Sequence, residues 1–319
     1  MTRLSLYNKG LFCGAQAILW ELEEYGACPL PSLRTINRIL CRNDLTHRRT
    51  GRYEPKGTPY PTLSAKAPNY LHQADFVGPR YLHGTDGTIR FYSMNVIDLA
   101  TGRCGIHPLI NRNGNAIYEA FWAIWSRLGI PQHLQVDNEL VFYGSPTYPR
   151  GMGPLIRLCL NYGIELWFIP PSEPWRNGVV EKFNDHYQQK FLDRIHMRTE
   201  KELRDGSLAF ECKHNSRYRY SKLNGKTPLK ALVQYGSKCL SFPHRHSVPR
   251  TPLDKPKTGY YHLIRLIRSH RTIDIFGECF RVAPELQYEY VVATIDVKEQ
   301  KLKLFHDQLQ VDEFDYKLR

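Results

Sequence analysis

The stretch WRNGVVEKFNDHYQQ, from Trp175 to Gln189, shows most clearly how this chain folds. Asn177 and Gly178 favour a turn, and the apolar residues that follow recur at steps of three and four: Val180, Phe183, Tyr187 and Phe191. This spacing predicts a half-buried helix with Glu181 in its first turn. Glu181 lies one residue off the apolar stripe, so its carboxylate is expected at the edge of the buried face. A lone glutamate there is usually only a favourable charge at the positive end of the helix dipole.

Two aspartates give Glu181 candidate partners. Asp75 ends a short stretch of alternating apolar residues that starts at Tyr70, and Asp137 ends a similar stretch that starts at Ile130. Both runs have the length and alternation of strands, so each aspartate is expected at a strand end. Aspartates in that position are more often caps or turn residues, but three carboxylates together suit a hard divalent cation such as Mg²⁺. A pair of such ions, about 3.5 to 4 Å apart, activates an attacking hydroxyl and stabilises the leaving oxygen of a phosphodiester.

The same residues resemble a known family. The order of Asp75, Asp137-Asn138 and NGVVEKFN (Asn177–Asn184) resembles the Asp-Asp-Glu signature of the retroviral-integrase-like core in insertion-sequence transposases. The stretch NSRYRYSKLNGKTPL (Asn215–Leu229) resembles the segment that closes that core. The similarity covers Pro68 to Tyr235. It implies an α/β ribonuclease H-like core, in which helices flank a mixed five-stranded sheet and the first aspartate lies on the central strand.

The resemblance also implies a function. It is that of a DNA transposase or integrase, which catalyses metal-dependent DNA strand cleavage and strand transfer without a covalent enzyme intermediate. Asp75, Asp137 and Glu181 would be both the catalytic and the metal-binding residues, for two Mg²⁺ or Mn²⁺ ions. The implied partners are double-stranded DNA, as element ends and target, further copies of the chain on that DNA, and in some relatives an accessory ATPase. Two alternatives stay open: a catalytically inactive DNA-binding regulator or transposase remnant, and a ribonuclease H-like nuclease without strand transfer.

The third acidic position departs from the family spacing. The usual distance from Asp137 would select Glu173 rather than Glu181. Three prolines surround Glu173 and predict an extended loop there: Pro170, Pro171 and Pro174. Because the Asn-Gly-x-x-Glu context belongs to Glu181, we select Glu181. The segment between Asp137 and Glu181 is longer than the family spacing. The additional residues are expected in the glycine- and proline-rich loop Tyr143–Pro154, where insertions are tolerated.

Two further acidic residues lie close to these motifs. Glu139 follows Asp137-Asn138 where the family usually has glycine, so it is expected either as a surface charge or as a modifier of metal affinity. Asp98 ends a predicted strand just before Thr101-Gly102, and capping of a turn explains it without any chemistry.

Composition favours a nucleic-acid partner. The 319 residues carry a formal net charge of +13, and 42% of them are hydrophobic, which is ordinary for a globular protein. The eight cysteines form no Cys-x-x-Cys pair, which argues against a zinc knuckle and a disulfide scaffold and suits a reducing compartment. The first residues have no uninterrupted apolar run of a signal peptide. We therefore expect a cytoplasmic, nucleoid-associated protein.

The segment before the core, residues 1–46, has the pattern of a helix-turn-helix that binds DNA. Gly14–Glu24 is predicted to be a helix ended by Gly26, and Leu33–Arg42 a second helix with Ser32 as its N-cap. The second helix is predicted to bury its apolar residues, Leu33, Ile36, Ile39 and Leu40. Its outer face carries the expected DNA contacts, Arg34, Asn37, Arg38 and Arg42. A small helical pair with a solvated basic face is the alternative.

The flanks of the core have a different composition. Residues 47–66 form a basic linker in which Arg48 and Arg49 are candidate DNA contacts, although such a charge run is more often simply solvated. A second linker, residues 237–256, precedes a region of short β-branched runs, residues 257–319. These runs predict a small all-β barrel or sandwich. The region resembles the small barrel that follows the core in phage Mu-like transposases.

The core itself, residues 67–236, alternates between strands and helices. Strands are predicted at Ile89–Ile97, Gly105–Pro108 and Ile164–Ile169, and helices at Asn115–Leu128 and Leu155–Tyr162. The helix that carries Glu181 is predicted to continue to Met197. Its exposed face holds three further candidate DNA contacts, Lys182, Gln188 and Lys190.

Overall fold

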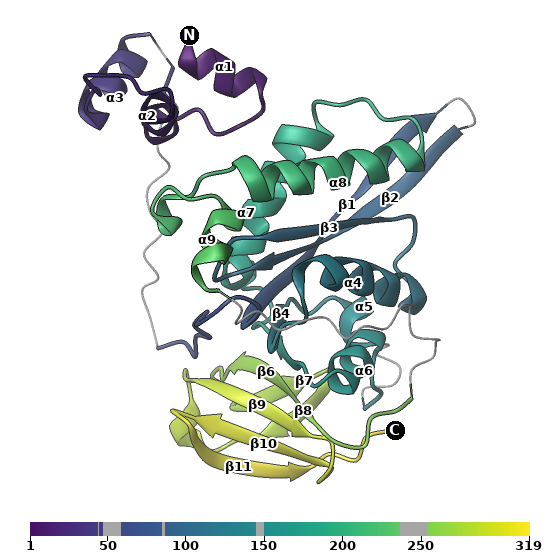
Figure 1. Ribbon diagram of the computed structural model, residues 1–319. Coiled ribbons are helices and arrows are strands. Elements are labelled where there is room, and N and C mark those ends of the chain that lie inside the picture. Colours follow the sequence, from purple (N-terminus) through teal and green to yellow (C-terminus); the bar gives the residue numbers. More distant parts are fainter. Residues whose placement is uncertain (44, 47–58, 85–86, 145–149, 237–253) are drawn as a thin grey trace.

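The computed structural model describes residues 1–43, 45–46, 59–84, 87–144, 150–236 and 254–319. Within them, nine strands form one sheet in the order β11-β10-β9-β6-β5-β4-β1-β2-β3, and β7 and β8 form a separate hairpin. Figure 1 shows three parts along the chain: a small helical unit at the N-terminus, a central α/β core, and strands at the C-terminal end. No helix among the described residues is long and apolar enough to cross a membrane.

The core sheet is ribonuclease H-like, as predicted. Three antiparallel strands come first, β1 (Leu71–Gly84), β2 (Gly87–Asp98) and β3 (Cys104–Leu109). Then β4 (His133–Val136) pairs in parallel with β1, and β5 (Glu165–Phe168) pairs in parallel with β4. This order places β1 at the centre of the five strands. The prediction that the first aspartate lies on the central strand is therefore confirmed.

Helices cover both faces of this sheet (Figure 1). One face packs on α4 (Gly114–Leu128), α5 (Leu140–Tyr143) and α6 (Pro154–Asn161). The other face packs on α7 (Gly178–Tyr187) and α8 (Glu200–Arg217), and α9 (Pro228–Gln234) lies against α8. Because neighbouring strand residues point to opposite faces, Ala74 and Phe76 enter the first cluster while Val77 enters the second. Asp75 therefore points toward α7.

Two helix predictions had different outcomes. The helix predicted at Asn115–Leu128 exists as α4, with Asn113 as N-cap, and it buries Trp122 and Trp125 as core aromatics. The predicted continuation of the Glu181 helix to Met197 was wrong. α7 ends at Tyr187, and one π-helical turn, η2 (Gln188–Leu192), follows it. A capping box at Thr199 and Glu202 then starts α8 as a separate helix. The regular spacing of apolar residues therefore continues past the end of α7, although the helix itself is broken there.

The N-terminal unit contains α1 (Thr2–Asn8), α2 (Ala15–Glu24) and α3 (Leu33–Arg42). α2 and α3 were predicted, and the Ser32 hydroxyl accepts a hydrogen bond from the Thr35 N–H as the N-cap. Of the four apolar residues of α3 that were predicted to be buried, two are buried and two are exposed. Ile36 and Leu40 pack against Leu6 and Ile18, whereas Leu33 is 38% exposed and Ile39 51% exposed. α1 and α2 cover only one narrow side of α3, and residues on its flanks stay in solvent.

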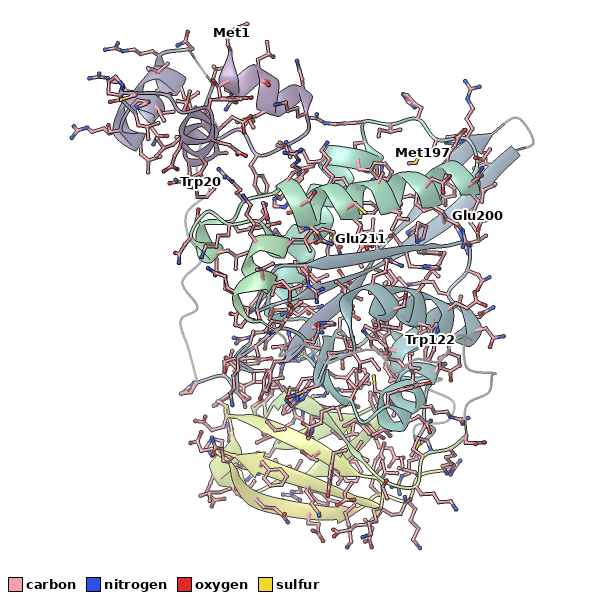
Figure 2. All side chains as sticks on the ribbon, viewed as in Figure 1. Met1, Trp20, Trp122, Met197, Glu200 and Glu211 are labelled. Carbon is pink, nitrogen blue, oxygen red and sulfur yellow. The ribbon has the colours of Figure 1, made fainter. Side chains whose placement is uncertain are left out.

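The helical unit contacts the core through a few specific interactions. The Tyr218 hydroxyl donates a hydrogen bond to the Gly10 carbonyl at 2.6 Å. Trp20 of α2 lies on the core side of the unit in Figure 2, against Gly225, where a Cβ atom would be only 2.7 Å from the indole ring. Gly225 follows a short 3-10 turn, η3 (Ser221–Leu223), and a larger residue there would push the two parts apart.

The C-terminal region is all-β, as predicted, and its strands continue the core sheet instead of closing on themselves. β6 (Tyr260–Leu266) pairs in parallel with β5 and antiparallel with β9. The other strands of this region are β7 (Thr272–Ile275), β8 (Glu278–Arg281), β9 (Tyr290–Asp296), β10 (Lys301–His306) and β11 (Leu309–Asp315), with the 3-10 turn η4 (Pro284–Leu286) before β9. Pairing with β6 protects the backbone of β5, which would otherwise be an open edge. The β7–β8 hairpin packs over this sheet in the same hydrophobic cluster, which gives two layers.

Candidate active site

The three predicted carboxylates come from three different elements. Asp75 lies inside β1, opposite Asn95 of β2. Its expected place at a strand end was wrong, because β1 continues as a long hairpin with β2 to Gly84. Asp137 follows the last residue of β4, and Glu181 lies in the first turn of α7, both as predicted.

Their electrostatics show that the three carboxylates lie in one acidic patch. Burial raises the pKa of Asp75 from 3.8 to about 7, and the negative charges of Asp137, Glu139 and Glu181 add to this rise. Burial also raises the pKa of Glu181, and the charges of Asp185 and Asp137 contribute. Asp75 and Glu181 line the same open cavity, of about 450 Å³. The charge of Asp137 thus acts on both of the carboxylates that line this cavity.

The chemistry of this patch fits a divalent cation. Its donors are carboxylate oxygens, which hard cations prefer. Burial is the main cause of their raised pKa values, and neighbouring negative charge, which a cation would offset, adds to it. Across the described part of the chain, however, no three His, Cys, Asp or Glu side chains are gathered closely enough to hold a metal ion as they stand.

A chain of hydrogen bonds fixes Asp75. Its Oδ1 accepts from the Phe76 N–H and its Oδ2 accepts from the Asn184 side-chain amide, each at 2.8 Å. The Asn95 amide donates to the Asn184 Oδ1 at 2.8 Å, and the Ser93 hydroxyl donates to the Asn95 Oδ1 at 2.9 Å. Ser93, Asn95 and Asn184 are buried. Because Asn184 is one turn along α7 from Glu181, this chain ties Asp75 to the helix that carries Glu181.

Glu139 belongs to the acidic patch and is not merely a surface charge. It is half-buried, and burial together with the charge of Asp137 raises its pKa. The Arg112 guanidinium pairs with its carboxylate at 2.5 Å and lies 4.5 Å from the centre of the Tyr92 ring. Sequence reasoning missed Arg112, which lies outside every motif and reaches the patch only in the folded chain.

A residue of the C-terminal sheet also supports the site. Arg265 of β6 is buried, and its Nη2 donates to the Asn138 Oδ1 at 2.9 Å. The Asn138 amide donates to the Ile169 carbonyl at 2.5 Å, and the Arg265 Nη1 donates to the same carbonyl at 3.3 Å. Asn138 directly follows Asp137, so β6 fixes the loop that carries the second aspartate. No local sequence signal could have indicated this contact.

The two competing acidic residues have structural partners. Glu173 accepts hydrogen bonds from the Tyr290 hydroxyl at 2.7 Å and from the Arg176 Nε at 3.0 Å, so it binds the C-terminal sheet. Asp98 is buried and accepts from the backbone N–H groups of Asn69 and Ala100 and from the Thr101 hydroxyl. Both act as the sequence had indicated, one in a proline-containing loop and the other as a turn cap.

The predicted DNA contacts fall in three places. Lys182 and Gln188 line the cavity beside Glu181, whereas Lys190 lies over the Tyr7 ring of α1, 5.9 Å from its centre. The candidates on α3 are exposed: Arg34, Asn37, Arg38 and Arg42. Arg48 and Arg49 lie outside the described residues. Sequence reasoning missed Arg80 of β1, whose Nη1 donates to the Gln188 Oε1 at 3.3 Å.

Comparison with known proteins agrees with this core. Residues 162–228, which include Glu181, match the integrase core domain family. The catalytic core of human T-lymphotropic virus 2 integrase in complex with magnesium aligns in its trimeric form with a TM-score of 0.39 and 18% identity, over 53% of this chain and 99% of that one. The dimeric form of that catalytic core aligns with a TM-score of 0.38 and 17% identity, over the same shares of the two chains.

A larger assembly also aligns. The simian T-cell lymphotropic virus intasome in complex with the PP2A regulatory subunit B56 gamma gives a TM-score of 0.44 and 15% identity, over 100% of this chain and 97% of that one. None of the curated proteins matches the chain. The match to the integrase core domain falls on the segment that supplies α7, so this part of the chain is similar to an integrase core.

Proposed function

We propose that this protein is a metal-dependent polynucleotidyl transferase that cleaves DNA strands and transfers them, as in DNA integration or transposition. The observation that carries the proposal is that Asp75 and Glu181 line one cavity within reach of the charge of Asp137, beside a segment that matches the integrase core domain. Keeping several carboxylates close together costs folding free energy. A protein that only bound DNA would gain nothing from such a patch, because it repels phosphates.

In this proposal each side chain has a defined task. Asp75, Asp137 and Glu181 would hold Mg²⁺ or Mn²⁺, which when bound lowers the barrier for attack on a phosphodiester and stabilises the leaving oxygen. Asn184 keeps the Asp75 carboxylate oriented through its hydrogen bond. Lys182 and Gln188, which line the same cavity, would contact the phosphates of the bound strand. Water or a DNA 3′-hydroxyl then attacks the phosphorus in line, a new P–O bond forms, and the old P–O bond breaks to release a 3′-hydroxyl.

The proposed partner is double-stranded DNA, both as element ends and as target. The formal net charge of +13 suits a polyanion, and the exposed side of α3 presents three arginines, Arg34, Arg38 and Arg42. Joining two DNA ends to one target requires more than one active site. The protein is therefore proposed to act as a homo-oligomer assembled on DNA.

The test is a strand-transfer assay on labelled DNA that carries the sequences flanking the gene, with Mg²⁺ or Mn²⁺. We expect nicked and joined products from the parent protein. Glu181→Gln should abolish both while DNA binding persists, because it removes a charged ligand and no phosphate anchor. The matched control is Glu173→Gln, which removes the competing carboxylate, keeps one of the two acceptor oxygens used by Tyr290 and Arg176, and should retain joining.

The same assay separates the competing functions. Nicked DNA without joined products would indicate a nuclease, and binding without either product would indicate a regulator. Loss of joining in Glu173→Gln together with retention in Glu181→Gln would contradict the assignment of the third carboxylate.

A further inference from the structure

Each of the two catalytic aspartates proposed here is preceded by a buried glutamine. Gln73 stands two positions before Asp75 on β1, and Gln135 stands two positions before Asp137 on β4. Residues two apart on a strand share a face, so Gln73 points to the same side of the sheet as Asp75, where α7 lies. Gln135 is paired with Gln73 in the register of β4 on β1. Gln73 is 4% exposed and Gln135 is 7% exposed. Buried amides of this kind need hydrogen-bond partners.

Both glutamines bind the turn from which α7 starts. That turn is the 3-10 segment η1 (Pro174–Asn177). The Arg176 carbonyl accepts from the Gln135 side-chain amide at 2.8 Å and from the Gln73 side-chain amide at 3.3 Å. The Asn177 amide donates in turn to the Ala74 carbonyl at 3.0 Å. Strands β1 and β4 therefore hold one and the same turn.

Gln73 also takes the place of a helix cap. Its Oε1 accepts from the backbone N–H groups of Val179 at 3.2 Å and Val180 at 3.1 Å, in the first turn of α7. These groups have no partner within a helix, and a side chain at the N-cap usually satisfies them. In the described structure the N-cap residue, Asn177, makes no side-chain capping bond to the helix. The cap is supplied by a strand that also carries Asp75.

We propose that Gln73 and Gln135 are positioning residues that fix Glu181 relative to Asp75 and Asp137. The inference rests on the proposed function. Gln73 shares β1 with Asp75, Gln135 lies two residues before Asp137 near the end of β4, and both glutamines donate to the turn that precedes Glu181. The separation of the three carboxylates is thereby set by buried hydrogen bonds. A displacement of about 1 Å in such a constellation lowers the rate by about a hundredfold.

The test compares Gln73→Met and Gln135→Met, which keep the side-chain length and remove the polar groups. We expect single-turnover joining to fall by about ten- to a hundredfold in each variant, with unchanged DNA affinity in the absence of divalent metal. Because both amides share the Arg176 carbonyl, the double variant should lose less than the product of the two single losses. Gln73→Glu keeps the acceptor for Val179 and Val180 and should recover part of the rate.

The matched control is Thr227→Ala. It removes the N-cap of α9, a buried residue of the core outside the turn that precedes α7, and should cost about 1 kcal/mol of stability. Joining by this control, measured well below its unfolding temperature, should equal that of the parent. A similar loss in the control would show that general destabilisation, and not positioning, explains the glutamine variants.

Amide hydrogen exchange separates failure of this inference from failure of the proposed function. The Val179 and Val180 amides should exchange faster in Gln73→Met than in the parent. Active variants with parental joining rates would overturn the positioning role and leave the proposed function intact. A parent protein that neither nicks nor joins DNA would overturn the proposed function and the catalytic role of the glutamines together, even if exchange at Val179 and Val180 accelerates as expected.

Discussion

At the scale of single residues, the cost of ionising Asp75 is the clearest physical signature of the site. Its pKa rises from 3.8 to about 7 because the carboxyl group is buried near three other carboxylates. Its hydrogen bonds from Phe76 and Asn184 hold it in place but do not offset this cost. The folded protein therefore retains a proton on Asp75 over a pH range in which the unfolded chain has lost it.

This predicts a specific pH dependence of stability in metal-free buffer. Between pH 3.8 and about 7 the folded state binds more protons than the unfolded state, so the contribution of Asp75 to stability falls as pH rises and is lost above the folded pKa. Asp75→Asn, which carries no charge, should be more stable than the parent by about 4 kcal/mol at pH 8 and equal to it near pH 3.5. Denaturant unfolding at both pH values measures this difference.

Asp185→Asn is the control for that experiment. Asp185 is exposed on α7 and lines the same cavity as Asp75. Its substitution should change stability by no more than about 0.5 kcal/mol at either pH. A stability gain in Asp75→Asn that is the same at pH 3.5 and pH 8 would contradict the account of Asp75.

At the scale of elements, the helix pair behind the site depends on a close contact between η2 and α8. Phe191 of η2 is buried, and a Cβ atom added to Gly206 of α8 would lie 2.6 Å from its ring. Replacing glycine by alanine within a helix ordinarily stabilises it by about 1 kcal/mol. Here the ring and the backbone both lack room to move, because Phe191 also packs on Tyr187 and Phe210.

Gly206→Ala should therefore destabilise the protein, by about 1 to 3 kcal/mol, instead of stabilising it. Phe191→Leu in the same chain should relieve the contact, so the double variant should lose less than the two single losses combined. Thermal unfolding of the four proteins measures the coupling. A stabilising effect of Gly206→Ala alone would show that the two elements are not packed this closely.

Elements with a strong local pattern were predictable from the sequence, and those without one were not. α4 and α3 have apolar residues at helical spacing and a capping residue, so both were found. α8 was missed because its sequence, EKELRDGSLAFECKHNSR, is largely polar and contains Gly206 in its middle. The break after Tyr187 was missed because the π-helical turn keeps Phe191 on the apolar side.

At the scale of the whole molecule, the C-terminal strands are part of the architecture that supports the site. β6 extends the core sheet by pairing with β5, and it carries Arg265, which binds Asn138. Tyr290 of β9 binds Glu173 in the loop before α7. Both contacts join segments about a hundred residues apart, so neither could be inferred from local composition or spacing. The sequence could indicate the candidate acidic residues, because each one lies in or beside an element with a recognisable pattern: Asp75 in β1, Asp137 after β4, and Glu181 in the first turn of α7.

The central claim is that Asp75, Asp137 and Glu181 form one cation-binding site, and calorimetric titration with Mn²⁺ tests it most directly. The parent protein should bind Mn²⁺. Each of three variants, Asp75→Asn, Asp137→Asn and Glu181→Gln, should bind it at least about tenfold more weakly, while Glu173→Gln should bind it as the parent does. Parental Mn²⁺ affinity in all three variants of the trio would contradict the account.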